Sequence, residues 1–224
     1  METEEYKGYT ITIKQDEDPV NPREEWDNLG TMICFHGRYR LGDKHDLKHE
    51  DFKGWSHLKK YIKNKLKGHI ILPLYAYEHS GITMNTTGFS CSWDSGQVGF
   101  IYITAEKIRQ EYSAIRISKK LKERVTGYLV GEVETFDQFL TGDVWGYTVS
   151  KEDDENVDDS CWGFFGDKYC LEEAKSVVDW YVKRQKELDK VNAIPLKKLP
   201  VYIGHKWEFD TSGERVAERI KEGK

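Results

Sequence analysis

The chain has 224 residues, of which 38% are hydrophobic, 33% charged and 13% aromatic, and its formal net charge at pH 7 is −5. The length suffices for one large domain with a core, and the aromatic content argues against a disordered chain. The negative net charge excludes a protein that binds nucleic acid through its overall charge. No apolar run approaches the ~20 residues that span a bilayer. We expect one domain over residues 1–224, with residues 195–224 as a candidate C-terminal appendage.

In the N-terminal part, alternating apolar and polar residues predict a strand at residues 9–14, and a short apolar run predicts another at residues 31–36. Residues 52–66 have the pattern of an amphipathic helix with a lysine-rich outer face. The apolar residues at helical spacing are Trp55, Leu58, Ile62 and Leu66.

In the middle of the chain, strands are predicted at residues 69–77, where Pro73 indicates a sheet edge or bulge, and at residues 97–104. Thr104 can cap a helix that follows it directly. A longer helix is predicted at residues 121–140, because apolar residues keep a spacing of three to four there.

In the C-terminal part, two strand-like runs flank the acidic residues 152–156, which predicts a hairpin. A helix is predicted at residues 171–191, and a last strand within residues 199–209. Strands and helices do not alternate strictly along the chain. We therefore expect an α+β fold, with an antiparallel or mixed sheet and helices packed mainly on one face.

The N-terminal sequence METEEYKGYT is acidic and polar, unlike a secretory signal. The four cysteines, Cys34, Cys91, Cys161 and Cys170, form no CxxC motif, and this pattern favours reduced thiols. We expect a soluble protein of the cytosol, in which Cys91 and Cys161 are small buried hydrophobic residues.

Three stretches combine Trp, Asp and Gly near the start of a predicted strand: EEWDNLG at 24–30, CSWDSG at 91–96 and DDSCWG at 158–163. We call them the WD–G stretches. An Asp before a Gly turn accepts backbone N–H bonds, and a neighbouring Trp shields these bonds from water. We favour this turn-building interpretation, which explains the recurrence without any ligand.

The alternative interpretation brings Asp27, Asp94 and Asp159 together at one edge of the sheet, each beside a Trp. Aromatic faces and carboxylates suit a nucleobase or a sugar, which they bind by stacking and hydrogen bonding. Loops after the strands would supply further contacts. The predicted ligand-binding residues are Trp26, Asp27, Arg38, Arg40, His79, Ser80, Trp93, Asp94 and Trp162.

Two histidines, His36 and His79, each follow or end a predicted strand. With Asp27 and Asp94 they could bind a divalent metal or act as general acid and base, as in a hydrolase or nuclease. A histidine at a strand end is more often a hydrogen-bonded structural residue, and we favour that interpretation. The sequence has no P-loop, GxGxxG, HExxH, GxSxG or zinc-finger spacing, so it indicates neither an enzyme class nor a cofactor.

Charge is unevenly distributed, because six lysines and no acid lie between Lys53 and Lys67. We interpret this run as a solvated helix face, with contact to nucleic-acid phosphates as the alternative. His45 and His49 lie in an acid-rich segment that has no third defined ligand. We interpret that segment and the acidic run at 153–159 as solvated loops.

The segments NPREEWDNLGTMICFHGRYRLGD, HSGITM, SWDSGQVGFIYIT and DSCWGFFG resemble a family of bacteriophage and prophage accessory proteins. The resemblance extends over roughly residues 9–166 and carries no catalytic residues. It implies a viral protein in the host cytosol with an accessory role such as counter-defence. We therefore expect a binding protein that recognises a nucleotide-like ligand or a host macromolecule, and the metal-dependent hydrolase or nuclease is the alternative.

Overall fold

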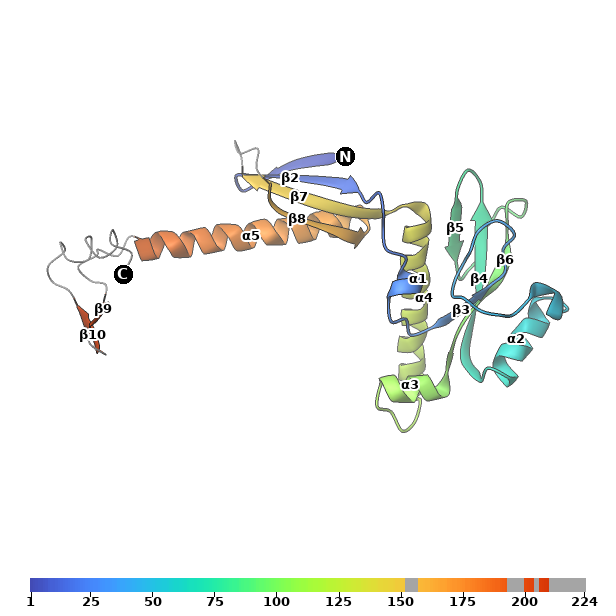
Figure 1. Cartoon of the computed structure of the whole chain (residues 1–224). Coiled ribbons are helices and arrows are strands. Elements are labelled where there is room, and N and C mark those ends of the chain that lie inside the picture. Colours follow the sequence, from blue (N-terminus) through green and yellow to red (C-terminus); the bar gives the residue numbers. More distant parts are fainter. Residues whose placement is uncertain (152–156, 193–199, 204–205, 210–224) are drawn as a thin grey trace.

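The computed structural model describes residues 1–151, 157–192, 200–203 and 206–209 (Figure 1). These residues form two four-stranded antiparallel sheets, a separate two-stranded ladder and five α-helices, so the fold is α+β as predicted. In chain order the elements are β1 (Glu2–Tyr6), β2 (Tyr9–Gln15), α1 (Pro22–Glu25), β3 (Thr31–Cys34), the 3-10 turn η1 (His49–Asp51), α2 (Trp55–Asn64), β4 (Gly68–Glu78), β5 (Ile82–Asn85), β6 (Ser95–Thr104), α3 (Ala105–Glu111), α4 (Lys119–Thr141), β7 (Val144–Lys151), β8 (Val157–Phe165), α5 (Asp167–Asn192), β9 (Pro200–Ile203) and β10 (Lys206–Phe209).

The first sheet has the strand order β1-β2-β7-β8, and α5 covers one of its faces (Figure 1). The alternation in β2 decides which residues face the helix, because successive side chains of a strand point to opposite faces. Ile11 and Ile13 are therefore buried against α5. Cys170, Ala174 and Val178 recur every four residues on the helix and complete this core.

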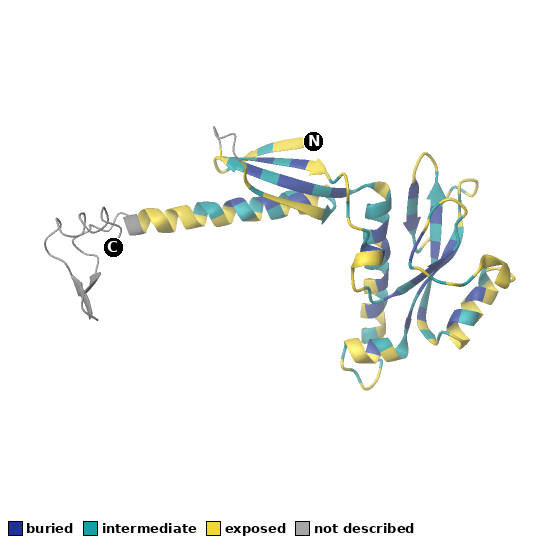
Figure 2. Cartoon of the chain, viewed as in Figure 1, coloured by how far each residue is buried: buried dark blue, intermediate teal, exposed yellow. Residues whose placement is uncertain are grey.

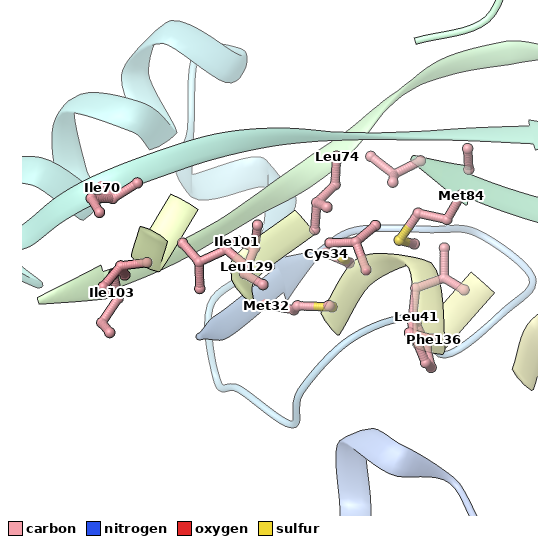
Figure 3. Close-up of a cluster of buried hydrophobic side chains, with 14 of the residues drawn as sticks. Met32, Cys34, Leu41, Ile70, Leu74, Met84, Ile101, Ile103, Leu129 and Phe136 are labelled. Atoms are coloured by element: carbon pink, nitrogen blue, oxygen red, sulfur yellow. The ribbon is translucent and has the colours of Figure 1, made fainter. Parts of the chain in front are cut away.

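The second sheet has the order β3-β6-β4-β5 and is covered on both faces (Figures 1 and 2). One core lies between this sheet and α4, and includes Met32, Leu74, Ile101, Leu129 and Phe136 (Figure 3). A smaller core lies between the opposite face and α2, and consists of Ile33, Leu58, Ile62 and Phe100. The neighbouring residues Met32 and Ile33 thus belong to different cores.

The predicted helices are confirmed, and their ends follow from local capping. The hydroxyl of Thr104 accepts a hydrogen bond of 3.1 Å from the backbone N–H of Lys107, as expected for the cap of α3. Ser118 caps α4 in the same way. The helix ends at Gly142, whose φ of 74° lies in the left-handed region that favours glycine.

The division of the strands into two sheets was not indicated by the sequence pattern. The short elements β1, β5, α1 and η1 were not predicted either, and the single strand expected within residues 199–209 is a pair, β9 and β10. The tip of the predicted hairpin at 152–156 and most of the candidate appendage lie outside the described residues. None of the helices in the described ranges is both long and apolar enough to cross a membrane.

Candidate functional site

A buried arginine holds the first WD–G stretch in place. Arg23 lies in α1, and its side chain is only 1% exposed. Its guanidinium donates to both carboxylate oxygens of Asp43 and to Glu132, each at 2.8 Å. It also donates to the carbonyl oxygen of Gly30 at 2.8 Å. Burial by itself would lower the pKa of Arg23, but the hydrogen bonds to the two carboxylates raise it, so the group stays charged.

The carboxylate that builds the turn in this stretch is Glu132, not Asp27. Glu132 accepts hydrogen bonds from the backbone N–H groups of Leu29 at 2.6 Å and Gly30 at 3.1 Å. Asp27 makes no hydrogen bond to any part of the chain that the structure describes. The turn-building interpretation of Asp27 was therefore wrong, and the residue that takes this role comes from α4, 102 positions beyond Gly30.

The register of the second sheet separates Asp27 from Asp94. β3 and β6 are antiparallel, with Thr31 opposite Tyr102 near the C-terminal end of β6. Asp27 therefore lies toward that end of β6, whereas Asp94 directly precedes its first residue. At about 3.3 Å per residue, the two ends of β6 are roughly 30 Å apart. The expectation that these two carboxylates share one edge was wrong.

The third WD–G stretch belongs to the first sheet. Asp159 and Trp162 lie on β8, and the hydroxyl of Tyr181 donates to the Asp159 carboxylate at 3.3 Å. The ring of Trp162 covers Gly146 of β7, where an added Cβ would lie 2.1 Å from the ring. Both side chains of this stretch thus have contacts within the first sheet and its helix.

The three tryptophans do not form one aromatic edge. Trp26 contacts Phe165 at the end of β8, with ring centroids 5.1 Å apart. Trp93, in contrast, is 94% exposed in the loop before β6. The predicted site built from all three Asp–Trp pairs is therefore not assembled.

Four of the predicted site residues do gather at the end of β4, around Glu78. Nε2 of His36 lies 3.4 Å from one Glu78 oxygen, and the guanidinium of Arg38 binds the other. Beside them, Nδ1 of His79 lies 3.5 Å from the carboxylate of Asp94. The backbone N–H of Glu78 donates to the carbonyl oxygen of Asp94 at 2.8 Å. Glu78 was missed in the sequence because nothing local distinguishes it from a surface acid.

The contacts of His36 are those of a structural residue. Its Nδ1 accepts from the backbone N–H groups of Arg38 at 3.2 Å and Tyr39 at 3.1 Å. In the neutral ring the proton is therefore on Nε2, which faces Glu78. Both ring nitrogens are engaged, so neither is free to take a proton from a substrate.

The second candidate histidine lies at an open hairpin turn. The side chain of His79 is 67% exposed, and the next residue, Ser80, has a φ of 55° in the left-handed region. Such an open position has no walls that would enclose a substrate. In the described ranges, no group of three or more His, Cys, Asp or Glu side chains is arranged to hold a metal ion.

A cavity of about 770 Å³ lies within the loop that joins β3 to η1. This volume falls in the range typical of small-molecule sites. Of the predicted ligand-binding residues, only Arg40 lines it. The lining residues are Cys34, Phe35, His36, Gly37, Tyr39, Arg40, Leu41, Asp43, Lys44, His45 and His49.

The loop closes because it folds back onto β3. The backbone N–H of Asp43 donates to the carbonyl oxygen of Met32 at 3.0 Å, and Nε2 of His45 donates to that of Cys34 at 3.1 Å. Gly42 has a φ of 70°, and a Cβ there would lie 2.9 Å from Met32. Nδ1 of His45 is buried without a hydrogen-bond partner in the described part of the chain. Such a nitrogen is costly unless a bound molecule or a water supplies a donor.

The cavity carries excess positive charge. Arg40 and Lys44 line it, and Arg40 has no carboxylate partner among the described residues. Lys44 lies 3.4 Å from Glu24, an exposed pair that water largely screens. The one carboxylate among the lining residues, Asp43, is paired with Arg23, whose guanidinium also binds Glu132. The free charges therefore favour an anion.

One wall of the cavity is aromatic. The ring of Phe35 contacts those of His45 at 5.3 Å and His49 at 5.4 Å between centroids. On another side, the Tyr39 ring lies 5.4 Å from that of His36, and the guanidinium of Arg38 lies 5.4 Å from the Tyr39 centroid, so Phe35 is the more open ring. Aromatic faces next to free cations can hold a planar group and a negative group of the same ligand.

A second, smaller cavity of about 370 Å³ contains Asp27 and Glu132. The guanidinium of Arg124 covers the rings of Tyr112 and Tyr128 there, at 5.4 Å and 5.6 Å from their centroids. A cation of the chain itself thus occupies these aromatic faces, and the cavity is less suited to a ligand than the loop cavity.

Burial makes Cys34 an unreactive thiol although it lines the loop cavity. Burial, together with the nearby Asp43 carboxylate, raises the pKa of Cys34 to about 12, against a smaller lowering by Arg23. Burial also raises the pKa of Cys170, to about 11. Neither residue forms a thiolate nucleophile at neutral pH. Cys161 is exposed and Cys91 half-buried, so the expectation that both are buried was wrong.

We expect a thiol reagent such as DTNB, at about pH 8, to modify only Cys91 and Cys161 in the folded protein and all four cysteines in urea. Mass spectrometry of peptides identifies the modified residues. Modification of Cys34 as fast as that of Cys161 would show that the base of the loop cavity is open.

From the sequence, most of the residues that line the cavity were interpreted as part of a solvated polar loop and not as a binding site. The signal was the run GRYRLGDKHDLKHED, which holds Arg40, Lys44, His45 and His49 close together. Acidic residues in the same run balance its positive charges, so the positive charge of the cavity could not be predicted. The sequence does not show that Asp43 pairs with the distant Arg23.

Comparison of the chain with protein-family models, curated proteins and solved structures found no match. The candidate site is therefore defined by the geometry of this chain alone.

Proposed function

We propose that this protein is a binding protein whose loop cavity holds a small, nucleotide-like anion. One observation carries the proposal: Arg40 and Lys44 line the same cavity of about 770 Å³ as an aromatic wall. Arginine and lysine are the residues that bind phosphate, and aromatic rings stack on nucleobases. The proposed ligand is the nucleotide-like molecule expected from the sequence. We now propose that it binds in the loop cavity and not at the Asp–Trp pairs.

Binding fits the cavity better than bond cleavage. The thiol of Cys34 is protonated at neutral pH, and both ring nitrogens of His36 have partners. Neither of these groups is a free nucleophile or base, whereas Nδ1 of His45, which has no partner among the described residues, can accept a hydrogen bond from a ligand.

We also propose, from the resemblance to phage accessory proteins, that the ligand or partner belongs to an infected host cell. Sequestration of a nucleotide would serve counter-defence there. The surface between Lys53 and Lys67 is a separate feature, and nucleic acid is the partner that its charge suits.

Thermal unfolding with a panel of ATP, GTP, cyclic AMP, cyclic GMP and inorganic phosphate tests the proposal. We expect at least one nucleotide to raise the melting temperature by several degrees, because a ligand at about 100 times its Kd stabilises by about 2.7 kcal/mol. In the double variant Arg40→Gln/Lys44→Gln, we expect the Kd of that nucleotide to rise at least about tenfold, since charge-assisted hydrogen bonds are lost.

The matched control is Arg116→Gln/Lys120→Gln, which removes the same charge from two exposed residues, Arg116 between α3 and α4 and Lys120 in the first turn of α4. This variant should bind like the natural protein. An equal loss of affinity in both double variants would assign binding to overall charge and contradict the site. No stabilisation by any compound of the panel would contradict the proposed function.

A further inference from the structure

The outer face of α2 is a patch of positive charge without any neutralising partner. Lys59, Lys60 and Lys63 are exposed on the helix, on the side of the second sheet that faces away from α4 (Figures 1 and 2). Lys53 precedes the helix, and Lys65 and Lys67 follow it, all three exposed. We call these six residues the α2 lysine face.

The α2 lysine face makes no ion pairs with the rest of the described chain, although the protein is acidic overall. Ion pairs between lysines and acids do form elsewhere, for example Lys175 with Glu4 at 2.7 Å. No Asp or Glu occurs between Phe52 and Tyr77. The positive charge is therefore kept apart from the negative charge that predominates elsewhere in the chain.

Most of these charges do not serve the stability of α2 itself, and only Lys63 lies in the last turn, where a cation interacts favourably with the helix dipole. Lys59 and Lys63 are four residues apart on one helix face, where like charges repel. The first turn has no acid to interact with the helix dipole, and the N-cap, Gly54, has no capping side chain. The helix is held by its buried side, through Leu58 and Ile62. An anionic partner would relieve the repulsion on the other side.

The chemistry of the face indicates which anionic partner fits. The face carries lysines and small polar residues, and no large apolar side chain of residues 53–67 is among the exposed ones. A helix that binds a membrane surface presents Trp, Phe or Leu next to its cations, and a protein interface buries an apolar centre. A face of charges alone fits a regular row of phosphates.

We propose that the α2 lysine face binds the phosphate backbone of a nucleic-acid duplex without reading its sequence. Lysine contacts to phosphates release condensed counterions, so the affinity must fall steeply as salt increases. The proposal is independent of the nucleotide ligand in the loop cavity, because none of these lysines lines that cavity.

The test is fluorescence anisotropy of a labelled 20-base-pair DNA duplex, and an RNA duplex of the same sequence, titrated with the full chain at several salt concentrations. The variant is Lys59→Gln/Lys60→Gln/Lys63→Gln. At low salt we expect its Kd to be at least about tenfold higher than that of the natural protein. The slope of log affinity against log salt should become shallower by about 2 to 3, because three phosphate contacts are lost.

The matched control is Lys119→Gln/Lys120→Gln/Lys122→Gln, which removes the same charge from exposed residues at the start of α4. It should leave both the Kd and the slope close to those of the natural protein. The α2 variant should also keep its melting temperature, or raise it slightly, since repulsion within the helix is removed. An unchanged melting temperature would show that the loss of binding in this variant is not caused by unfolding.

Binding of either duplex that depends on the α2 lysines and not on the α4 lysines supports the proposal. Three results overturn it: no binding of either duplex at low salt, equal losses in the two triple variants, or binding of vesicles containing phosphatidylserine in place of nucleic acid.

Discussion

Replacement of Arg23 by alanine is expected to lower the free energy of unfolding by about 3–5 kcal/mol. The change leaves the carboxylates of Asp43 and Glu132 without the cation that both contact at 2.8 Å. The carbonyl oxygen of Gly30 also loses its donor. Removing one member of a buried charge network lowers the free energy of unfolding by more than the network as a whole adds to it. The reason is that the remaining charges stay buried without a partner or full solvation.

Urea unfolding followed by circular dichroism measures this effect, with Arg38→Ala as the control. Arg38 is also paired with a carboxylate, but its side chain is 72% exposed, so the expected loss is about 1 kcal/mol or less. The loss of unfolding free energy in Arg23→Lys should lie between those of the two alanine variants. Lysine keeps the positive charge but lacks the planar guanidinium that donates several hydrogen bonds at once. Equal effects of Arg23→Ala and Arg38→Ala would contradict the central role assigned to the buried network.

Replacement of Gly99 by alanine is expected to lower the free energy of unfolding by about 3 kcal/mol, at the upper end for overpacked sites. A Cβ at this position would lie 2.0 Å from the carbonyl oxygen of Ile33 and 2.9 Å from Cα of Cys34. These atoms belong to the backbone of β3, so no side-chain rotation relieves the clash. The end of β3 would have to move, and with it the base of the loop cavity.

Gly96→Ala is the matched control on the same strand, because no atom lies within 4 Å of a Cβ built there. We expect it to change stability by no more than about 0.5 kcal/mol. Urea unfolding measures both variants. A loss in Gly99→Ala as small as that in Gly96→Ala would show that β3 and β6 are not packed as closely as described.

Features that depend on neighbouring residues were predictable from the sequence. The spacing of Leu58 and Ile62 predicted α2, and the position of Thr104 predicted the cap of α3, because both signals act within one or two helical turns. The partition into two sheets was not predictable in this way. It depends on the pairing of β2 with β7, two strands separated by more than a hundred residues.

The candidate site was only partly predictable for the same reason. Asp27 and Asp94 both follow a Trp and precede a Gly, but the antiparallel register of β3 and β6 places them at opposite ends of the sheet. Arg40 was recognised as a ligand-binding candidate from its loop. The cavity around it depends on two long-range pairs, Arg23 with Asp43 and Arg23 with Glu132, that no local pattern signals.

Hydrogen exchange measured by mass spectrometry tests the central claim most directly, because it shows where a ligand binds. The full chain is compared with and without the nucleotide that gives the greatest thermal stabilisation. The loop cavity predicts slower exchange in peptides covering residues 35–49 and little change at 91–96 or 158–163. Protection confined to those two WD–G segments, or no protection at 35–49, would contradict the account.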